Sequence, residues 1–214
     1  MMHAYEETYL NDAMNNLGDM FDYALCDLGC DAEEFYSQFL MSGVAEKFGA
    51  GNPKYVAGLS GPELAMEVLH VTEGERPETM PSVAYERSPE YWSGWILAYY
   101  QWFSGHGFSY MRKRGVSFSK VRSLYPTLHE ADVTKFVSVA DRMIEENRRE
   151  EPSRLQQMRK NSGLTQRELA ERSGTSLRMV QLYEQRQQDI RRAEAQTLVS
   201  LSLVLGCNVV DLFE

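Results

Sequence analysis

The stretch from Leu164 to Glu184, LTQRELAERSGTSLRMVQLYE, constrains the fold of this chain more than any other feature. Thr165 is followed three residues later by Glu168, a capping box that predicts the start of a helix. Gly174 stands where that helix must end, because glycine adopts a positive φ at little cost. Ser176 is placed to cap a second helix. We therefore expect two short helices joined by a tight, rigid turn.

Apolar side chains in this stretch recur at helical spacing and separate an inner side from an outer side. Leu169 and Ala170 are predicted to face inward in the first helix. Val180 and Tyr183 are predicted to do so in the second. The outer side of the second helix is then free to contact a partner, and its residues are Leu177, Arg178 and Gln181.

This pattern resembles the helix-turn-helix of the phage Cro and repressor type, found in the XRE family of bacterial DNA-binding regulators. Residues 152–161, PSRLQQMRKN, fit the helix that precedes the motif in that family. In the ending LGCNVVDLFE, Gly206 fits a helix stop and Asn208 the cap of a last turn. The resemblance implies a five-helix domain over residues 152–214. The apolar positions of its last two helices are Leu198, Leu201, Leu205, Val209, Leu212 and Phe213.

The resemblance also implies which residues meet DNA, since the second helix of the motif lies in the major groove. Arg178 would bind guanine with two hydrogen bonds, Gln181 would bind adenine, and Leu177 would touch a thymine methyl group. Ser176 matches a further base-facing position. Family members often carry polar residues where this chain has Leu177 and Leu182, so each leucine is expected either beside DNA or packed against a partner. The positions assigned to phosphate contacts are Thr165, Gln166, Arg167, Arg186 and Arg191.

Charge divides the chain near residue 151. Residues 152–214 hold nine basic and seven acidic side chains, a net charge of +2, whereas residues 1–151 carry a net charge of −11. An acidic chain of this kind is poorly suited to non-specific binding of nucleic acid, because such binding requires many phosphates to be neutralised at once. The charges favour a small contact area on double-stranded DNA for each copy of the chain, and a homodimer would double that area. Residues 144–151 are a charged connector, either helical or a hinge.

Residues 1–143 predict an acidic helical domain, so the whole chain is expected to be all-α. Apolar residues recur at steps of three and four along residues 10–28 and 35–48. Further helices are expected after Gly61 and Ser88, and over residues 132–143. A loop is expected over residues 72–85, and short strands near residues 55–59 stay an alternative.

The segment YWSGWILAYYQWF, residues 91–103, contains all three tryptophans of the chain. It is too short to span a bilayer, which takes about 20 residues. One interpretation is the main core helix of the N-terminal domain, with Tyr91 and Tyr100 off the buried stripe. The other is a groove for a protein partner, because interfaces use exposed aromatic residues as anchors. The partner-binding candidates are Tyr91, Trp92, Trp95 and Tyr100.

No residue pattern points to catalysis, a cofactor or a metal. SGHGFSY, residues 104–110, lacks the lysine and the spacing of a phosphate-binding loop. Cys26, Cys30 and Cys207 are expected to be buried thiols, and the four histidines show no metal spacing. We expect a cytoplasmic protein without a membrane segment.

Two hypotheses for the function remain. The first is a sequence-specific transcriptional regulator, a dimer on a palindromic operator, whose N-terminal helices dimerise or sense a ligand. The second is an antitoxin-like interaction protein whose N-terminal domain holds a protein partner with a basic site. That second hypothesis rests on analogy with antitoxins that contain an XRE-like domain. The two are compatible, because such antitoxins often repress their own operon.

Overall fold

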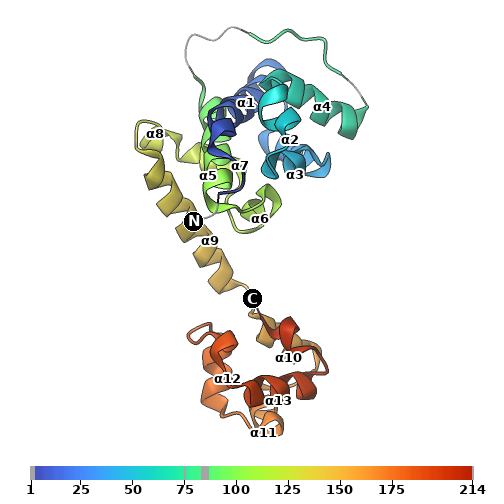
Figure 1. The fold of residues 1–214 in the computed structure, drawn as a ribbon, viewed down its shortest axis with the longest axis vertical. Coiled ribbons are helices and arrows are strands. Elements are labelled where there is room, and N and C mark those ends of the chain that lie inside the picture. Colours follow the sequence, from blue (N-terminus) through green and yellow to red (C-terminus); the bar gives the residue numbers. More distant parts are fainter. Residues whose placement is uncertain (1–2, 75, 83–86, 214) are drawn as a thin grey trace. The chain divides into compact units, whose positions relative to one another are not determined.

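The computed structural model describes residues 3–74, 76–82 and 87–213, and every regular element within these ranges is helical (Figure 1). The chain forms two compact units, Met1–Glu145 and Glu146–Glu214. Each unit has its own apolar core. The expected all-α fold class is confirmed, and residues 55–59 contain a π-helical turn rather than a strand.

The N-terminal unit (Met1–Glu145) is built around two long helices, α1 (Leu10–Asp22) and α5 (Pro89–Ser104), which pack against each other over their length. The other elements surround this pair. They are η1 (Glu7–Tyr9), η2 (Tyr23–Asp27), α2 (Ala32–Met41), α3 (Val44–Gly49), η3 (Lys54–Gly58), α4 (Gly61–Glu73), α6 (Phe108–Lys113), α7 (Phe118–Ser123), α8 (Tyr125–Leu128) and α9 (Val133–Glu150).

Glycines set how closely α1 and α5 approach each other. A Cβ atom added to Gly94 of α5 would lie 2.4 Å from the carbonyl oxygen of Leu17 in α1. One added to Gly18 of α1 would lie 2.7 Å from the ring of Tyr91 in α5. Only glycine fits at such distances, so these two positions are required by the packing of the two helices.

Most of the aromatic residues of α5 belong to the core, which corrects the prediction of exposed anchors. Tyr91, Trp92 and Tyr100 are all buried. The hydroxyl group of Tyr91 donates to Asn15 Oδ1 at 2.7 Å, and that of Tyr100 donates to Asp141 Oδ1 at 2.6 Å. The prediction that Tyr91 and Tyr100 lie off the buried stripe is wrong, because α5 is covered on several sides and has no single buried face. Trp95 is half-buried and packs against the core.

Two further expectations, the start of the loop after α4 and the burial of the cysteines, differ from the structure. Helix α4 continues to Glu73, and Gly74 ends it with a φ of 80°, so the following loop begins later than Thr72. Part of the expected loop, residues 75 and 83–85, lies outside the described residues. Cys26 is exposed, so the expectation that all thiols are buried is wrong, although Cys30 and Cys207 are half-buried.

The C-terminal unit (Glu146–Glu214) places short helices around a small apolar core, in the order expected from the sequence. Helix α9 runs to Glu150, so most of the segment 144–151 is helical. The last element is a 3-10 helix that begins with a capping box between Asn208 and Asp211. The elements are α10 (Arg154–Asn161), α11 (Gln166–Ser173), α12 (Leu177–Glu184), η4 (Ile190–Arg192), α13 (Ala195–Leu205) and η5 (Val209–Leu212).

Candidate nucleic-acid interface

Side-chain caps fix both ends of the turn between α11 and α12. The carboxylate of Glu168 accepts hydrogen bonds from the backbone N–H and the hydroxyl group of Thr165, both at 2.8 Å. These bonds, led by the one from the backbone N–H, lower the pKa of Glu168. Gly174 ends α11 with a φ of 68°, and the hydroxyl group of Ser176 accepts from the backbone N–H of Met179 at 3.2 Å. The predicted caps and turn are confirmed.

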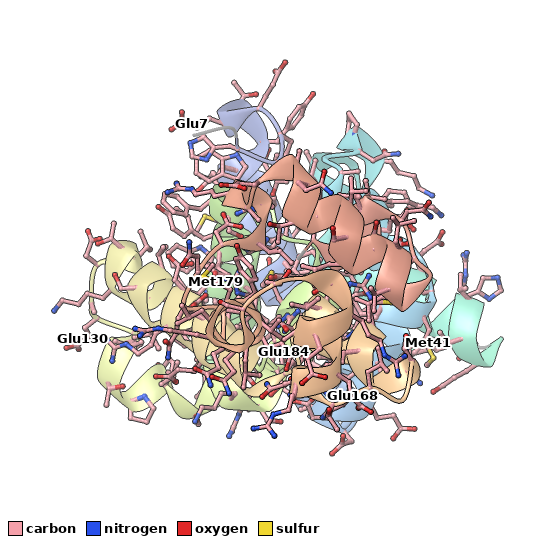
Figure 2. All side chains as sticks on the ribbon, turned by 90° about the horizontal axis from the view of Figure 1, so that it is seen from below. Glu7, Met41, Glu130, Glu168, Met179 and Glu184 are labelled. Atoms are coloured by element: carbon pink, nitrogen blue, oxygen red, sulfur yellow. The ribbon has the colours of Figure 1, made fainter. Side chains whose placement is uncertain are left out.

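A buried ion pair joins α10 to α12. Arg159 donates from Nε to Glu184 Oε1 at 2.6 Å and from Nη2 to Glu184 Oε2 at 3.0 Å, and the two residues are only 8% and 6% exposed. Arg159 Nη1 also donates to the carbonyl oxygen of Leu164 at 2.6 Å. Gln166 Nε2 donates to Glu184 Oε2 at 2.8 Å and connects α11 to the same carboxylate (Figure 2, where Glu184 is labelled). This network holds α12 against the two preceding helices.

The outer face of α12 is a stripe at positions 178, 181, 182 and 185, the spacing of one helix face. Arg178 and Gln185 are exposed, and Gln181 and Leu182 are half-buried. Within the described ranges, the guanidinium group of Arg178 forms no hydrogen bond or ion pair, so its donors are available to a ligand. The structure thus brings Arg178 and Gln181 to one surface.

The two leucines of α12 differ in their surroundings. Leu177 is half-buried and packs against the core of the C-terminal unit, because it lies three residues before the buried Val180. It is therefore only partly on the outer side where the sequence placed it. Leu182 is half-buried but does not belong to that apolar cluster. Leu182, rather than Leu177, is the apolar side chain of the outer stripe.

Two open hollows flank the N-terminus of α12. One, of about 490 Å³, lies beside Arg167 and Leu177, and the other, of about 400 Å³, lies beside Met179 and Arg192. Both are also lined by residues 174–176 of the turn. Each hollow is lined by one basic and one acidic side chain, Arg167 with Glu171 in the first and Arg192 with Glu194 in the second.

The five residues assigned to phosphate contacts fall into different settings. Arg167 is exposed and forms no hydrogen bond or ion pair within the described part of the chain. Arg191 is paired with Asp189, Nη2 to Oδ2 at 2.9 Å. Thr165 is engaged in the capping box, and the amide group of Gln166 in the bond to Glu184.

Arg186 is half-buried, and its Nη1 donates to the carbonyl oxygen of Glu151 at 2.6 Å. Its φ of 54° is the only positive value among the described residues other than glycine. A left-handed backbone at a side-chain-bearing residue is strained, and surrounding contacts must hold it. The side chain of Arg186 thus fastens the turn after α12 to the segment before α10.

Sequence reasoning missed three residues of this region. Arg159 and Glu184 were read only as charges, although each lies four residues after a buried position, Leu155 and Val180. This spacing places both charges on the inner face of their helices and was the available signal. Gln185 was also missed, although it lies seven residues after Arg178 and completes the outer stripe.

The described residues contain no group of three or more histidine, cysteine, aspartate or glutamate side chains placed to hold a metal ion. Partial desolvation of the sulfur atom raises the pKa of each of the three thiols, and the nearby carboxylates of Asp22 and Glu90 raise that of the exposed Cys26 further, to about 11. Within the described ranges, no helix combines the length and the apolar character needed to cross a membrane.

Comparison with protein families gives a match between the helix-turn-helix model HTH_3 and residues 155–212. The match covers α10 to η5, and so includes the whole of the interface described above. Comparisons with curated proteins and with solved structures give no match.

Proposed function

Residues 155–212 form an XRE-type helix-turn-helix domain, and from this premise we propose that the protein is a sequence-specific transcriptional regulator that reads DNA with α12. The observation that carries the proposal is the outer stripe of α12. It presents free donors and acceptors on a helix that the buried pair of Arg159 and Glu184 holds in place. A helix that is already held in place loses little entropy on binding, so more of the contact energy remains to discriminate between bases.

Two side chains of α12 carry most of the base recognition. The guanidinium group of Arg178 binds O6 and N7 of a guanine, and the amide group of Gln181 binds N6 and N7 of an adenine. Leu182 or the exposed part of Leu177 contacts a thymine methyl group, and Ser176 lies at the end of α12 that enters the groove. Gln185 extends the same face and is a further candidate for a base contact.

Phosphate contacts flank the reading helix. Arg167 and Arg192 are exposed, lie beside the two hollows, and have guanidinium groups without hydrogen bonds or ion pairs to described residues. Arg191 contributes less, because Asp189 already neutralises its charge. Backbone N–H groups in the first turn of α11, at Gln166, supply a further contact. A homodimer doubles this small set and reads two half-sites about 34 to 36 Å apart.

The proposal is tested by gel-shift titration of the full chain against the DNA upstream of its own gene. A scrambled duplex of the same length and composition is the control, and both are titrated at two salt concentrations. We expect a shift that is selective for the upstream DNA at both concentrations. Equal binding to the two duplexes, falling steeply with salt, would contradict sequence-specific recognition.

A second candidate function concerns the N-terminal unit. Residues 1–151 carry a net charge of −11 and include a complete core that a DNA-reading domain does not require. We propose as the alternative that this unit holds a protein partner with a basic site, as an antitoxin does, while the C-terminal unit regulates the shared operon. Co-expression with each neighbouring gene product tests it, and the expected result is a co-purifying protein whose toxicity the full chain suppresses.

A further inference from the structure

A hollow of about 410 Å³ opens on the surface of the N-terminal unit and is lined by residues of α2, α3, α5 and α6. Its volume is in the range of binding sites for small organic molecules. Phe108, which is 2% exposed, and the half-buried Leu40 form its apolar part. The exposed residues Glu46, Ser109 and Tyr110 form its rim. We call this site the α3–α6 hollow.

Gln101 of α5 brings a buried hydrogen-bond acceptor to the wall of the hollow. The residue is 1% exposed, and its Nε2 donates to the carbonyl oxygen of Gly49 at 3.1 Å, which fixes the orientation of the amide group. Its Oε1 has no hydrogen-bond partner among the residues that the structure describes. Native proteins leave few buried acceptors unsatisfied, because each one costs free energy. An N–H group of a bound molecule would satisfy Oε1.

The glycine at position 107 keeps the wall of the hollow free of a side chain. Gly107 precedes α6 with a φ of −68°, a value that any residue adopts. A Cβ atom added to Gly107 would meet no atom within 4 Å, so no neighbouring group requires glycine there. Neither the backbone nor the packing explains the glycine, and what it provides is space in the hollow.

The charge of the hollow indicates the kind of molecule that fits it. Among the described residues that line the hollow, Glu46 alone has a charged side chain. None of the basic residues beside these in the sequence lines it, namely Lys47, Arg112, Lys113 and Arg114. Residues 1–151 also carry a net charge of −11. A positively charged molecule is therefore attracted to the hollow, and a carboxylate is repelled.

We propose that the α3–α6 hollow binds a small organic cation with an apolar ring that carries an N–H group. The ring packs against Phe108 and Leu40, and the cationic end lies beside Glu46. The N–H group donates to Gln101 Oε1, which a small side-chain movement of the kind common on binding uncovers. The inference goes beyond the proposed function, because it concerns the N-terminal unit alone and holds whether or not the C-terminal unit reads DNA.

The test titrates the full chain with three indole probes of similar size. Tryptamine has a ring N–H group and an ammonium group, 1-methyltryptamine lacks the ring N–H group, and indole-3-propionate has a carboxylate in place of the ammonium group. Ligand-observed NMR measures each dissociation constant. We expect about 0.1 to 1 mM for tryptamine, as for a ligand of about a dozen non-hydrogen atoms. Binding should be about two- to tenfold weaker for 1-methyltryptamine and at least about tenfold weaker for indole-3-propionate.

Two pairs of substitutions locate the bound probe. Gly107→Leu occupies the hollow and should weaken tryptamine binding at least about tenfold, whereas the smaller side chain of Gly107→Ala should weaken it less. Both variants should melt at the temperature of the parent chain, because position 107 has space and an ordinary φ. Glu46→Gln should abolish the preference for tryptamine over indole-3-propionate. Glu78→Gln, at an exposed glutamate outside the hollow, should keep it.

The inference would be overturned if the parent chain did not bind tryptamine, or bound it no better than either of the other probes. Equal tryptamine binding by the parent chain and Gly107→Leu would also overturn it, since the probe would then lie elsewhere. Should Gly107→Leu fail to fold, the comparison of Glu46→Gln with Glu78→Gln decides, and equal preferences in those two chains would reject the site. None of these measurements involves DNA, so a failure of the proposed function would leave their outcome unchanged.

Discussion

Arg159 shows how strongly the position of α12 depends on one buried charge. Its guanidinium group is hydrogen-bonded to Glu184 and to the carbonyl oxygen of Leu164, so removing it leaves the carboxylate of Glu184 buried without its cation. We expect Arg159→Ala to lower the free energy of unfolding of the C-terminal unit by about 3 to 5 kcal/mol. Urea denaturation measures the loss, and Arg167→Ala, at an exposed arginine, should change stability by less than about 0.5 kcal/mol. Equal effects of the two substitutions would show that the ion pair is not structural.

In the proposed function, Arg178 is the residue on which sequence specificity would depend most. Arg178→Ala removes the donors that bind guanine and should weaken binding to the preferred operator by about 1 to 3 kcal/mol. Binding to random DNA should change little, because that binding depends on phosphates. Gel-shift titrations on both duplexes measure the difference, and Lys160→Ala, at an exposed position of α10, is the control for lost charge. A similar loss on both duplexes would show that Arg178 contacts phosphate instead.

At the residue scale, the sequence predicted the helix caps, which depend on neighbouring residues, and missed the buried ion pair, which depends on tertiary packing. The cap pairs of Thr165 with Glu168 and of Asn208 with Asp211 involve residues three apart, so their spacing is visible in the chain. The partners Arg159 and Glu184 are 25 residues apart, and only the packing of α10 against α12 brings them together. The available signal in the sequence was that each of these charged residues lies on the same helix face as a buried apolar residue.

Among the helices, the crossing of α1 and α5 sets the architecture of the N-terminal unit. Gly94→Ala would force a methyl group against the carbonyl oxygen of Leu17, and we expect it to destabilise this unit by about 1 to 3 kcal/mol. Gly107→Ala is the matched control, because a Cβ there meets no atom within 4 Å and its φ is −68°. Thermal unfolding followed by tryptophan fluorescence reports on this unit, since all three tryptophans lie in α5. A Gly94→Ala protein as stable as Gly107→Ala would show that the helices can move apart.

Sequence periodicity predicted that α5 is a helix but not how fully it is buried. A stripe of apolar residues indicates one inner face, and Tyr91 and Tyr100 lie beside that stripe. Their rings are nonetheless buried, because their hydroxyl groups reach acceptors on the half-buried Asn15 and the exposed Asp141. A tyrosine is compatible with either side of a helix when its hydroxyl group has a partner, and such partners come from distant segments.

Over the whole molecule, the boundary between the two compact units and the change from acidic to basic net charge lie at nearly the same position in the sequence. The boundary between the compact units lies at residues 145 and 146, close to the change of net charge near residue 151. The proposed function explains why a net charge of only +2 suffices for residues 152–214, since specificity would come from a few base contacts by the α12 helix of each copy rather than from many phosphates. We expect the acidic N-terminal unit in turn to suppress non-specific attachment to DNA.

This separation leads to a prediction for the isolated C-terminal unit. A fragment of residues 146–214 contains the whole of its apolar core and should fold cooperatively by itself, as measured by urea denaturation. If the C-terminal unit itself joins two copies, the fragment also keeps its preference for a palindrome over a half-site, because it contains the dimer contact. If the N-terminal helices supply the dimer, the fragment loses that preference while binding half-sites normally. The ratio of palindrome to half-site affinity, measured on the fragment and on the full chain, therefore assigns the dimer contact to one unit.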